Sequence, residues 1–423
     1  MRTPRGINVP VWCPVNVKAA VVSGTIVLLC SCTALDAPLD PPGDTGASFS
    51  AARIDLGTLG GRWSIAADIN STEVVVGSAE TASGATHAFR WSASEGMIDL
   101  GLLPGDSESE AVAVLDNNEI LGFSGSNNRW TPVVWSALGE KRSLPIPLLP
   151  GATFGRPTAF NALGKVVGWD VSATEHAWIW SDAAGKLDLT ASVPGGSLEG
   201  AASAITSSGS VLLTTRTTGC EATVECWRTY LWSTAAGYRS LGTPDGSADV
   251  AVTGLGTNDN GTVVGWFARG EIGTTAYRWD VSTGFTLLPH YGSGAYRAGY
   301  AMAVSGSGVV VGAEREPISG TYVATVWPTA STIVRLSPED PNPSVAVAIN
   351  GHGTIAGWAA ISDGANHAMI WKQGSTAVAA RSPAAIPLHA SVATASSACV
   401  ANVIALITKQ RLTACAIKSA RGD

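Results

Sequence analysis

The segment "THAFRW" (Thr86–Trp91) recurs along the chain, and its recurrence decides the fold. Close copies are "EHAWIW" (Glu175–Trp180) and "NHAMIW" (Asn366–Trp371), and looser copies such as "TAYRW" (Thr275–Trp279) end in the same residue. The tryptophans that end these segments stand at positions 91, 135, 180, 232, 279, 327 and 371, separated by 44, 45, 52, 47, 48 and 44 residues. A period of this size indicates a repeat architecture.

Each period contains the same succession of short segments. A small and apolar run such as "SIAADIN" (Ser64–Asn70) is followed by a polar turn, an apolar run that often ends in glycine, the tryptophan segment and a last run such as "MIDLG" (Met97–Gly101). Four such segments with period-two patterning predict a four-stranded antiparallel meander. One such sheet cannot bury both of its faces, whereas seven around an axis can. We therefore expect an all-β chain, a seven-bladed β-propeller of four-stranded antiparallel blades over residues 51–380, with an open β-solenoid as the alternative.

The run "ARIDLG" (Ala52–Gly57) precedes the first full repeat and matches the last strand of the others. We expect it to close the ring by completing the last blade, although "STAVAAR" (Ser375–Arg381) competes for that place. His87, His176 and His367 occupy one register on the third strand of three separate blades. Because zinc–nitrogen distances are about 2.0–2.1 Å, these imidazoles lie too far apart to share a metal ion, and we interpret them as scaffold.

Several recurring motifs carry a family resemblance. "DLGTLGG" (Asp55–Gly61), "ADIN" (Ala67–Asn70) and "HAFRW" (His87–Trp91) resemble the HAF repeat family of probable extracellular bacterial proteins. The resemblance covers about residues 53–378. It implies a β-propeller fold and export from the cell, and it implies no particular activity.

The N-terminus is typical of an export signal over residues 1–31. Its apolar core (19–31) has 13 residues, fewer than the roughly 20 that a membrane-spanning helix needs. The following "LCSC" (Leu29–Cys32) resembles the lipobox of bacterial lipoproteins and predicts lipidation at Cys32, with an ordinary secretory signal cut a few residues later as the alternative. Residues 32–50, rich in Pro, Gly and Asp, then form a flexible tether. We expect a lipoprotein of the outer membrane or cell surface, otherwise a secreted protein.

Charge and cysteine content fit this location. The formal charge is −7, and removal of three basic residues with the signal changes it to −7 − 3 = −10, which argues against nucleic acid as a partner. Four cysteines outside the signal form two local pairs, and an even number in an oxidising compartment favours disulfides. The disulfide candidates are Cys220 with Cys226, and Cys399 with Cys415. Their spacing fits no CxxC zinc site, and no cofactor is expected.

The fourth repeat contains an insertion that predicts a binding face. The stretch "TTRTTGCEATVECWRTY" (Thr214–Tyr230) lengthens the loop between its second and third strands. In a meander this loop shares one face with the connections between blades, and a disulfide at its tip reduces the entropy cost of presenting it. We expect a protein or polysaccharide partner on this face. The candidate binding residues are Arg216, Glu221, Glu225, Trp227 and Arg228.

The sequence predicts no catalytic constellation, and residues 381–423 are interpreted as a linker and C-terminal extension. Trp169, Trp266 and Trp358 each follow a second-strand glycine and are candidates for stacking on a sugar ring. The alternative to a binding scaffold is a propeller enzyme that acts on extracellular glycans through carboxylates near the central channel. Two channel carboxylates about 5–9.5 Å apart indicate the enzyme, whereas a ring of Ala, Ser and Val indicates the scaffold.

Overall fold

The computed structural model describes residues 20–22, 25–27, 51–126, 129–217, 226–247, 250–268, 273–291, 297–317 and 319–373. The chain divides into two units, Met1–Thr45 and Gly46–Asp423. In the first unit the described residues form a short antiparallel pair, β1 (Ala20–Val22) with β2 (Thr25–Val27). In the second unit they form strands and one 3-10 turn (Thr190–Ser192), with no α-helix.

The second unit consists of antiparallel sheets that follow one another along the chain. Three of the four-stranded sheets are β4–β7 (Gly60–Ile69, Val75–Thr81, Thr86–Ser92, Gly96–Asp99), β8–β11 (Glu108–Val114, Ile120–Ser126, Arg129–Trp135, Lys141–Ser143) and β12–β15 (Phe154–Phe160, Val166–Val171, Glu175–Ser181, Gly185–Asp188). The next is β16–β19 (Ser197–Ile205, Val211–Thr217, Trp227–Ser233, Gly237–Ser240). Each is a simple meander, as the repeat pattern predicts.

Beyond these, an eight-stranded sheet joins two meanders. They are β20–β23 (Ala251–Thr257, Val263–Ala268, Gly273–Asp280, Gly284–Leu287) and β24–β27 (Arg297–Val304, Val310–Arg315, Tyr322–Thr329, Thr332–Arg335). The joint is a parallel contact of two residue pairs, Gly273 with Arg297 and Thr274 with Ala298. The sequence does not predict it. It arises because the third strand of one meander and the first strand of the next run in the same direction and begin at the same face.

The last sheet is completed from the other end of the chain. It contains β28 (Ser344–Ile349), β29 (Ile355–Ala360) and β30 (Asn366–Gln373), and its outer strand is β3 (Ala51–Asp55), paired antiparallel with β30. The expected closure by the run that begins near Ala52 is confirmed. The competing "STAVAAR" segment lies outside the described residues.

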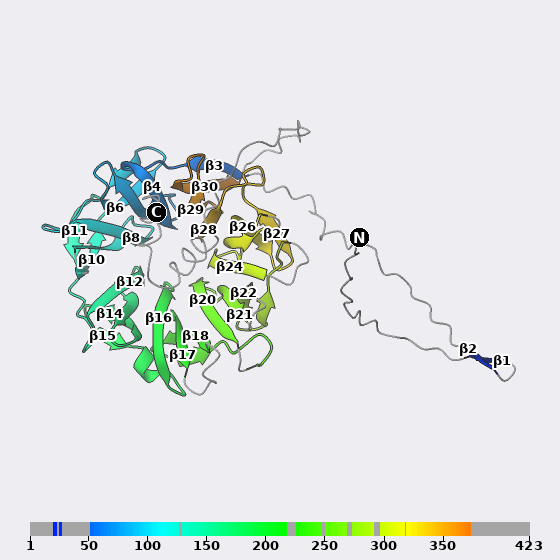
Figure 1. The fold of residues 1–423 in the computed structure, drawn as a ribbon. Helices are drawn as coiled ribbons and strands as arrows, with labels where there is room; N and C mark the ends of the chain where they lie inside the picture. The colour runs from blue at the N-terminus through cyan, green and yellow to red at the C-terminus, as the bar shows by residue number, and fades with distance from the viewer. Residues whose placement is uncertain are drawn as a thin grey trace, which may run out of the picture. The chain divides into compact units, whose positions relative to one another are not determined.

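The sheets form a closed ring. Each sheet packs on the next, and the last packs on the first where β28 and β29 lie against β4. The first strand of each meander lies innermost, so that β4, β8, β12, β16, β20, β24 and β28 surround a central channel (Figure 1). This arrangement excludes the open solenoid.

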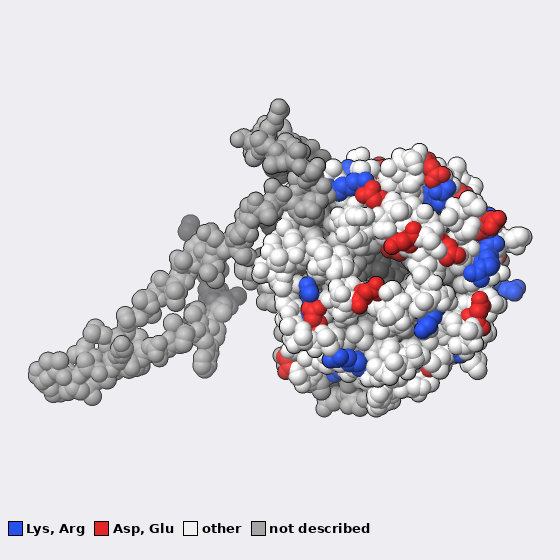
Figure 2. Space-filling model, turned by 180° about the vertical axis from the view of Figure 1, so that it is seen from behind, with Lys and Arg blue, Asp and Glu red and all other residues white. Residues whose placement is uncertain are grey.

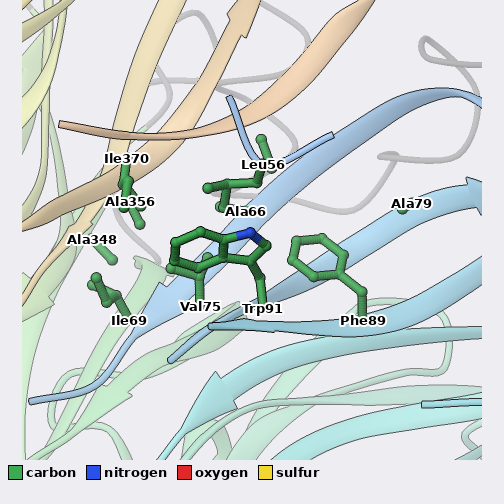
Figure 3. Packing of buried hydrophobic residues seen from close by; sticks show 11 residues of the cluster. Leu56, Ala66, Ile69, Val75, Ala79, Phe89, Trp91, Ala348, Ala356 and Ile370 are labelled. Carbon is green, nitrogen blue, oxygen red and sulfur yellow. The ribbon is translucent and has the colours of Figure 1, made fainter. Parts of the chain in front are cut away.

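The recurring tryptophans pack between neighbouring sheets. Trp91 lies in one buried cluster with Leu56 and with Ala348, Ala356 and Ile370 of the last sheet (Figure 3). The same relation recurs around the ring, with each tryptophan clustered against residues of the preceding sheet. The indole N–H of Trp135 also donates to the carbonyl of Leu100 in the sheet before it. These tryptophans therefore pack the sheets against one another.

A bulge in every first strand explains the glycine that ends the second-strand run. In the first sheet the register shifts between Ala66 and Asp68, and equivalent shifts occur in the others. A Cβ atom on Gly77 would lie 2.1 Å from the carbonyl oxygen of Ile65, and one on Gly122 would lie 2.0 Å from that of Glu110. Glycine leaves room for this carbonyl and stands at the equivalent position in every sheet except the fourth, which has Leu213 there.

Asparagines link the sheets at the tight turns between first and second strands. The Asn258 side-chain oxygen accepts hydrogen bonds from the N–H groups of Asn260 and Thr262 within its own turn, and its nitrogen donates to the carbonyl of Ser305 in the next sheet. Asn350 makes the equivalent donation to the carbonyl of Asn70, 3.0 Å away, and thereby joins the last sheet to the first. The "NDNG" segment is thus a hairpin turn.

The three histidines of the repeated motif each pair with an aspartate. The Nδ1 atoms of His87, His176 and His367 lie 2.7–2.9 Å from carboxylate oxygens of Asp99, Asp188 and Asp55, respectively. Each aspartate is the last residue of the fourth strand in the same sheet and also accepts a backbone N–H two residues further on. The histidines belong to separate sheets and order strand ends. Among the described residues, no group of His, Cys, Asp and Glu is arranged to hold a metal ion.

Candidate functional site

The central channel encloses a cavity of about 560 Å³. Small and apolar side chains of the first strands form most of its wall, including Ala67, Ala113, Ala159, Ser203 and Val347. Figure 2 shows one face of the ring, where the molecule is hollowed at its centre and acidic side chains lie around the hollow. A few larger or charged side chains interrupt this lining of small residues, and they define the candidate site.

The two faces of the ring differ in their connections. The first–second and third–fourth turns, such as residues 70–74 and 93–95, lie on what we call the turn face. The second–third loops and the connections between sheets, such as residues 82–85 and 100–107, lie on the opposite side, the loop face. First strands begin at the loop face because the meander is antiparallel.

The residue just before the bulge varies around the channel. In the second and third sheets it is Glu110 and Arg156, respectively, near the loop-face ends of β8 and β12. The equivalent residues of the other sheets are uncharged: Ile65, Ala201, Thr253, Tyr300 and Val345. Two opposite charges on neighbouring sheets therefore interrupt an otherwise uncharged ring.

Glu110 and Arg156 face each other across the boundary between these sheets. Arg156 Nη1 lies 3.8 Å from Glu110 Oε2, with side-chain exposures of 14% and 7%. The guanidinium carbon lies 4.5 Å from the ring centre of Phe123, 5.3 Å from Trp130 and 5.4 Å from Phe154. Burial raises the pKa of Glu110, and the charge of Arg156 opposes this shift.

Four tryptophans also line the channel cavity. Trp63 and Trp169 belong to the first and third sheets, and Trp227 and Trp266 belong to the fourth and fifth. Trp63 and Trp266 are half-buried, whereas Trp169 and Trp227 are buried. We call Glu110, Arg156 and these four tryptophans the mouth cluster.

Of the three tryptophans proposed from the sequence for sugar stacking, Trp358 does not reach the channel. It is 1% exposed and packs with Met302, Tyr322 and Val345 between sheets. Trp169 and Trp266 do line the cavity. Sequence spacing alone does not distinguish Trp358 from Trp169 and Trp266, because all three follow the second-strand glycine of their sheets.

Asp68 is the other carboxylate in the channel wall. It closes the bulge of β4 at a position where the other first strands have Ala or Gly, and its oxygens accept the N–H groups of Ile69 (2.8 Å) and Val114 (2.9 Å). Burial raises the pKa of Asp68 to about 6. Glu110 pairs with Phe123 and Val114 with Ile120, three residues apart on β9, so these two backbone positions lie about 10 Å apart along the sheet at roughly 3.3 Å per residue. Asp68 thus contacts β8 beyond its bulge, whereas Glu110 precedes the bulge.

The predicted binding loop is described only at its base. Arg216 Nε lies 3.1 Å from Glu199 Oε1, and Arg228 Nη1 donates to the carbonyl of Val250 in the next sheet. Trp227 points into the channel wall rather than standing at the loop tip. Glu221 and Glu225 lie outside the described residues.

The predicted covalent features fall largely outside the described part of the chain. Cys226 is buried, and its candidate partner Cys220 is among the residues that the structure does not describe. The same holds for Cys32, Cys399 and Cys415. Lipidation and both disulfide pairings stay predictions. In the part of the chain that the structure covers, no helix has the length and apolarity needed to span a membrane.

A closed ring of antiparallel meanders, with first strands lining a channel, defines a β-propeller. Solved structures share this fold with the chain. It is similar to a puromycin hydrolase (13% identity, TM-score 0.50, covering 74% of this chain and 52% of that one) and to a virginiamycin B lyase from Staphylococcus aureus (12% identity, TM-score 0.47, covering 76% and 98%). The Aleuria aurantia lectin also matches, at 9% identity and a TM-score of 0.37, covering 64% of this chain and 93% of that one.

These likenesses concern the fold alone. The chain spans about half the length of the puromycin hydrolase. No protein-family profile and no curated relative matches the sequence.

Proposed function

We propose that this chain is an exported, lipid-anchored, seven-bladed propeller that acts as a binding scaffold for a protein or polysaccharide, and that it belongs with the HAF repeat proteins. The blade number treats the eight-stranded sheet as two meanders joined by the two-residue contact of Gly273 and Thr274. Export and anchoring rest on the N-terminal sequence and on the lipobox-like segment that ends at Cys32.

The gathering of irregular residues at one end of the channel carries the proposed binding role. Recurring side chains pack the sheets against one another, whereas Glu110, Arg156 and the neighbouring indoles line the cavity near the loop face. A few polar groups placed in a largely apolar concavity are typical of a ligand site. Asp68 accepts two backbone N–H groups, which favours a structural role for this carboxylate.

A pull-down with the chain released from its signal tests this function. We expect envelope or extracellular material to retain the wild type but not a variant that lacks residues 219–225, in which the channel residue Trp227 is left in place. The matched control replaces Leu138 and Leu163 with Ser on the turn face, where they are 89% and 62% exposed by residue. Equal retention of all three proteins would contradict recognition through the loop face.

Anchoring is tested separately. We expect labelled palmitate to be incorporated into the wild type, and incorporation to be lost in Cys32→Ser and after globomycin treatment. Processing that is insensitive to globomycin would refute the anchor and leave the secretory alternative.

A further inference from the structure

Glu110 is a buried carboxylate that lacks a hydrogen-bond partner among the described residues. Its side chain is 7% exposed and lines the channel cavity, and the nearest cation, Arg156 Nη1, is 3.8 Å away, beyond hydrogen-bond distance. The contact with Arg156 is an ion pair too long for a hydrogen bond, so the Glu110 carboxylate keeps acceptor capacity that a donor within the cavity can use.

Arg156 is a fixed donor beside this acceptor. Three aromatic rings stack against its guanidinium and restrict its orientation, and its Nε atom is buried without a partner. Because Glu110 and Arg156 carry opposite charges, their net charge at neutral pH is zero. An anionic ligand is repelled by Glu110 and a cationic ligand by Arg156. The pair best suits a neutral group that both donates and accepts.

The indoles of the mouth cluster line the same cavity as this pair. Trp169 is the cross-strand partner of Arg156, and Trp63 and Trp266 are half-buried residues of the first and fifth sheets. Pyranose rings have one face of C–H groups, which packs on aromatic rings, and an edge of hydroxyls that donate and accept hydrogen bonds. A volume of about 560 Å³ lies within the roughly 300–1,000 Å³ of small-molecule sites.

We propose that the mouth cluster binds a neutral sugar residue, with its C–H face on an indole and adjacent hydroxyls between Glu110 and Arg156. This inference rests on the proposed binding function and names its ligand class. Hydroxyls donate to the Glu110 carboxylate and accept from the Arg156 guanidinium, which uses the hydrogen-bonding capacity that the ion pair leaves.

The test uses a glycan array probed with the labelled chain released from its signal. The array holds neutral malto-, cello- and manno-oligosaccharides, sialylated and uronic-acid glycans, and chitosan oligomers. We expect retention on neutral glycans. Glu110→Gln removes a hydrogen bond to a charged acceptor and should weaken binding about ten- to a hundredfold, corresponding to about 1.5–3 kcal/mol.

Matched variants separate the site from general damage. Glu108→Gln changes a carboxylate two residues earlier on β8 that does not line the cavity, and it should bind like wild type. Arg156→Lys keeps the charge but loses the planar donor, and it should bind more weakly. Thermal denaturation of each variant verifies folding.

Three outcomes would overturn the sugar site: an array that retains no glycan, retention only on charged glycans, or neutral binding unchanged in both Glu110→Gln and Arg156→Lys. If the pull-down still depends on residues 219–225 in any of these cases, the scaffold function stands and the sugar site alone is wrong.

Discussion

Replacement of Arg156 with Met tests whether Glu110 is a buried charge held by its neighbour. Removal of one partner from a buried ion pair costs about 3–5 kcal/mol. Because the two charged groups are 3.8 Å apart and Arg156 is 14% exposed, we expect Arg156→Met to lose about 3 kcal/mol of unfolding free energy at pH 7.5, the lower end of this range. Met preserves much of the contact with Phe123 and its neighbours, so the lost cation–π attraction adds only about 0.5–1 kcal/mol.

The loss of stability in Arg156→Met should be larger at pH 7.5 than at pH 4. The pKa of Glu110 is raised in the folded protein, so its ionisation disfavours folding at pH values above the unfolded value of 4.5. Loss of the Arg156 charge raises this pKa further. At pH 4 the carboxyl is protonated, and the deficit should fall to about 1 kcal/mol, leaving the cation–π part.

Urea denaturation of wild type, Arg156→Met and the double variant with Glu110→Gln, at pH 4 and pH 7.5, measures these differences. The double variant should lose only about 1 kcal/mol at either pH, because its neutral amide needs no counter-charge. A deficit of Arg156→Met that is equal at both pH values, or that persists in the double variant, would refute the buried-charge interpretation.

Three further perturbations probe the ring. Trp135→Ala should cost about 3–5 kcal/mol in thermal denaturation because the indole is fully buried and bonded to Leu100, whereas Leu138→Ala at an exposed turn should change stability by less than about 0.5 kcal/mol. Asn350→Ala and Asn258→Ala remove equivalent hydrogen bonds and should each lower the free energy of unfolding by about 1–3 kcal/mol. Only Asn350→Ala should speed hydrogen exchange in the β3–β30 ladder, because the Asn350 bond joins the last sheet to the first. Asp68 has a pKa of about 6 in the folded protein against 3.8 when unfolded, so its protonated form favours folding. The stability of the wild type should therefore fall relative to that of Asp68→Ala as pH rises from about 4 to above 6. Urea midpoints that change in parallel for the two proteins over this range would contradict the raised pKa.

The spacing of the tryptophans is sufficient to predict the meanders, and the packing of Trp91 and its equivalents is consistent with that repeat. A period near 46 residues leaves room for one four-stranded sheet, and an aromatic at a fixed place in each sheet must contact a neighbour. The histidines were assigned to the scaffold for a related reason: residues repeated in separate sheets cannot converge. Their aspartate partners at the strand ends follow from the recurring "DL" of Asp55, Asp99 and Asp188.

The pair of Glu110 and Arg156 was not predicted, although its signal is present. Both residues open the first-strand run of successive repeats, at a position where other repeats have uncharged side chains. Their encounter depends on adjacent sheets presenting the same position across a boundary, which only the ring geometry establishes. The sequence indicates the loop around Glu221 instead, because an insertion changes the spacing of the repeats. A single charged residue within a regular strand does not change that spacing.

The pairing of β3 with β30 has a mechanical consequence under the proposed anchoring. A tether that ends at Ala51 transmits any pull from the cell surface directly into this ladder, beginning at the pair formed by Ala51 and Gln373. The outer strand that completes the last sheet is thus also the point of attachment. Force on the anchor would act on the strand pair that closes the ring before it acts on any other sheet. External shear would therefore reach the channel through the five residue pairs of β3 and β30.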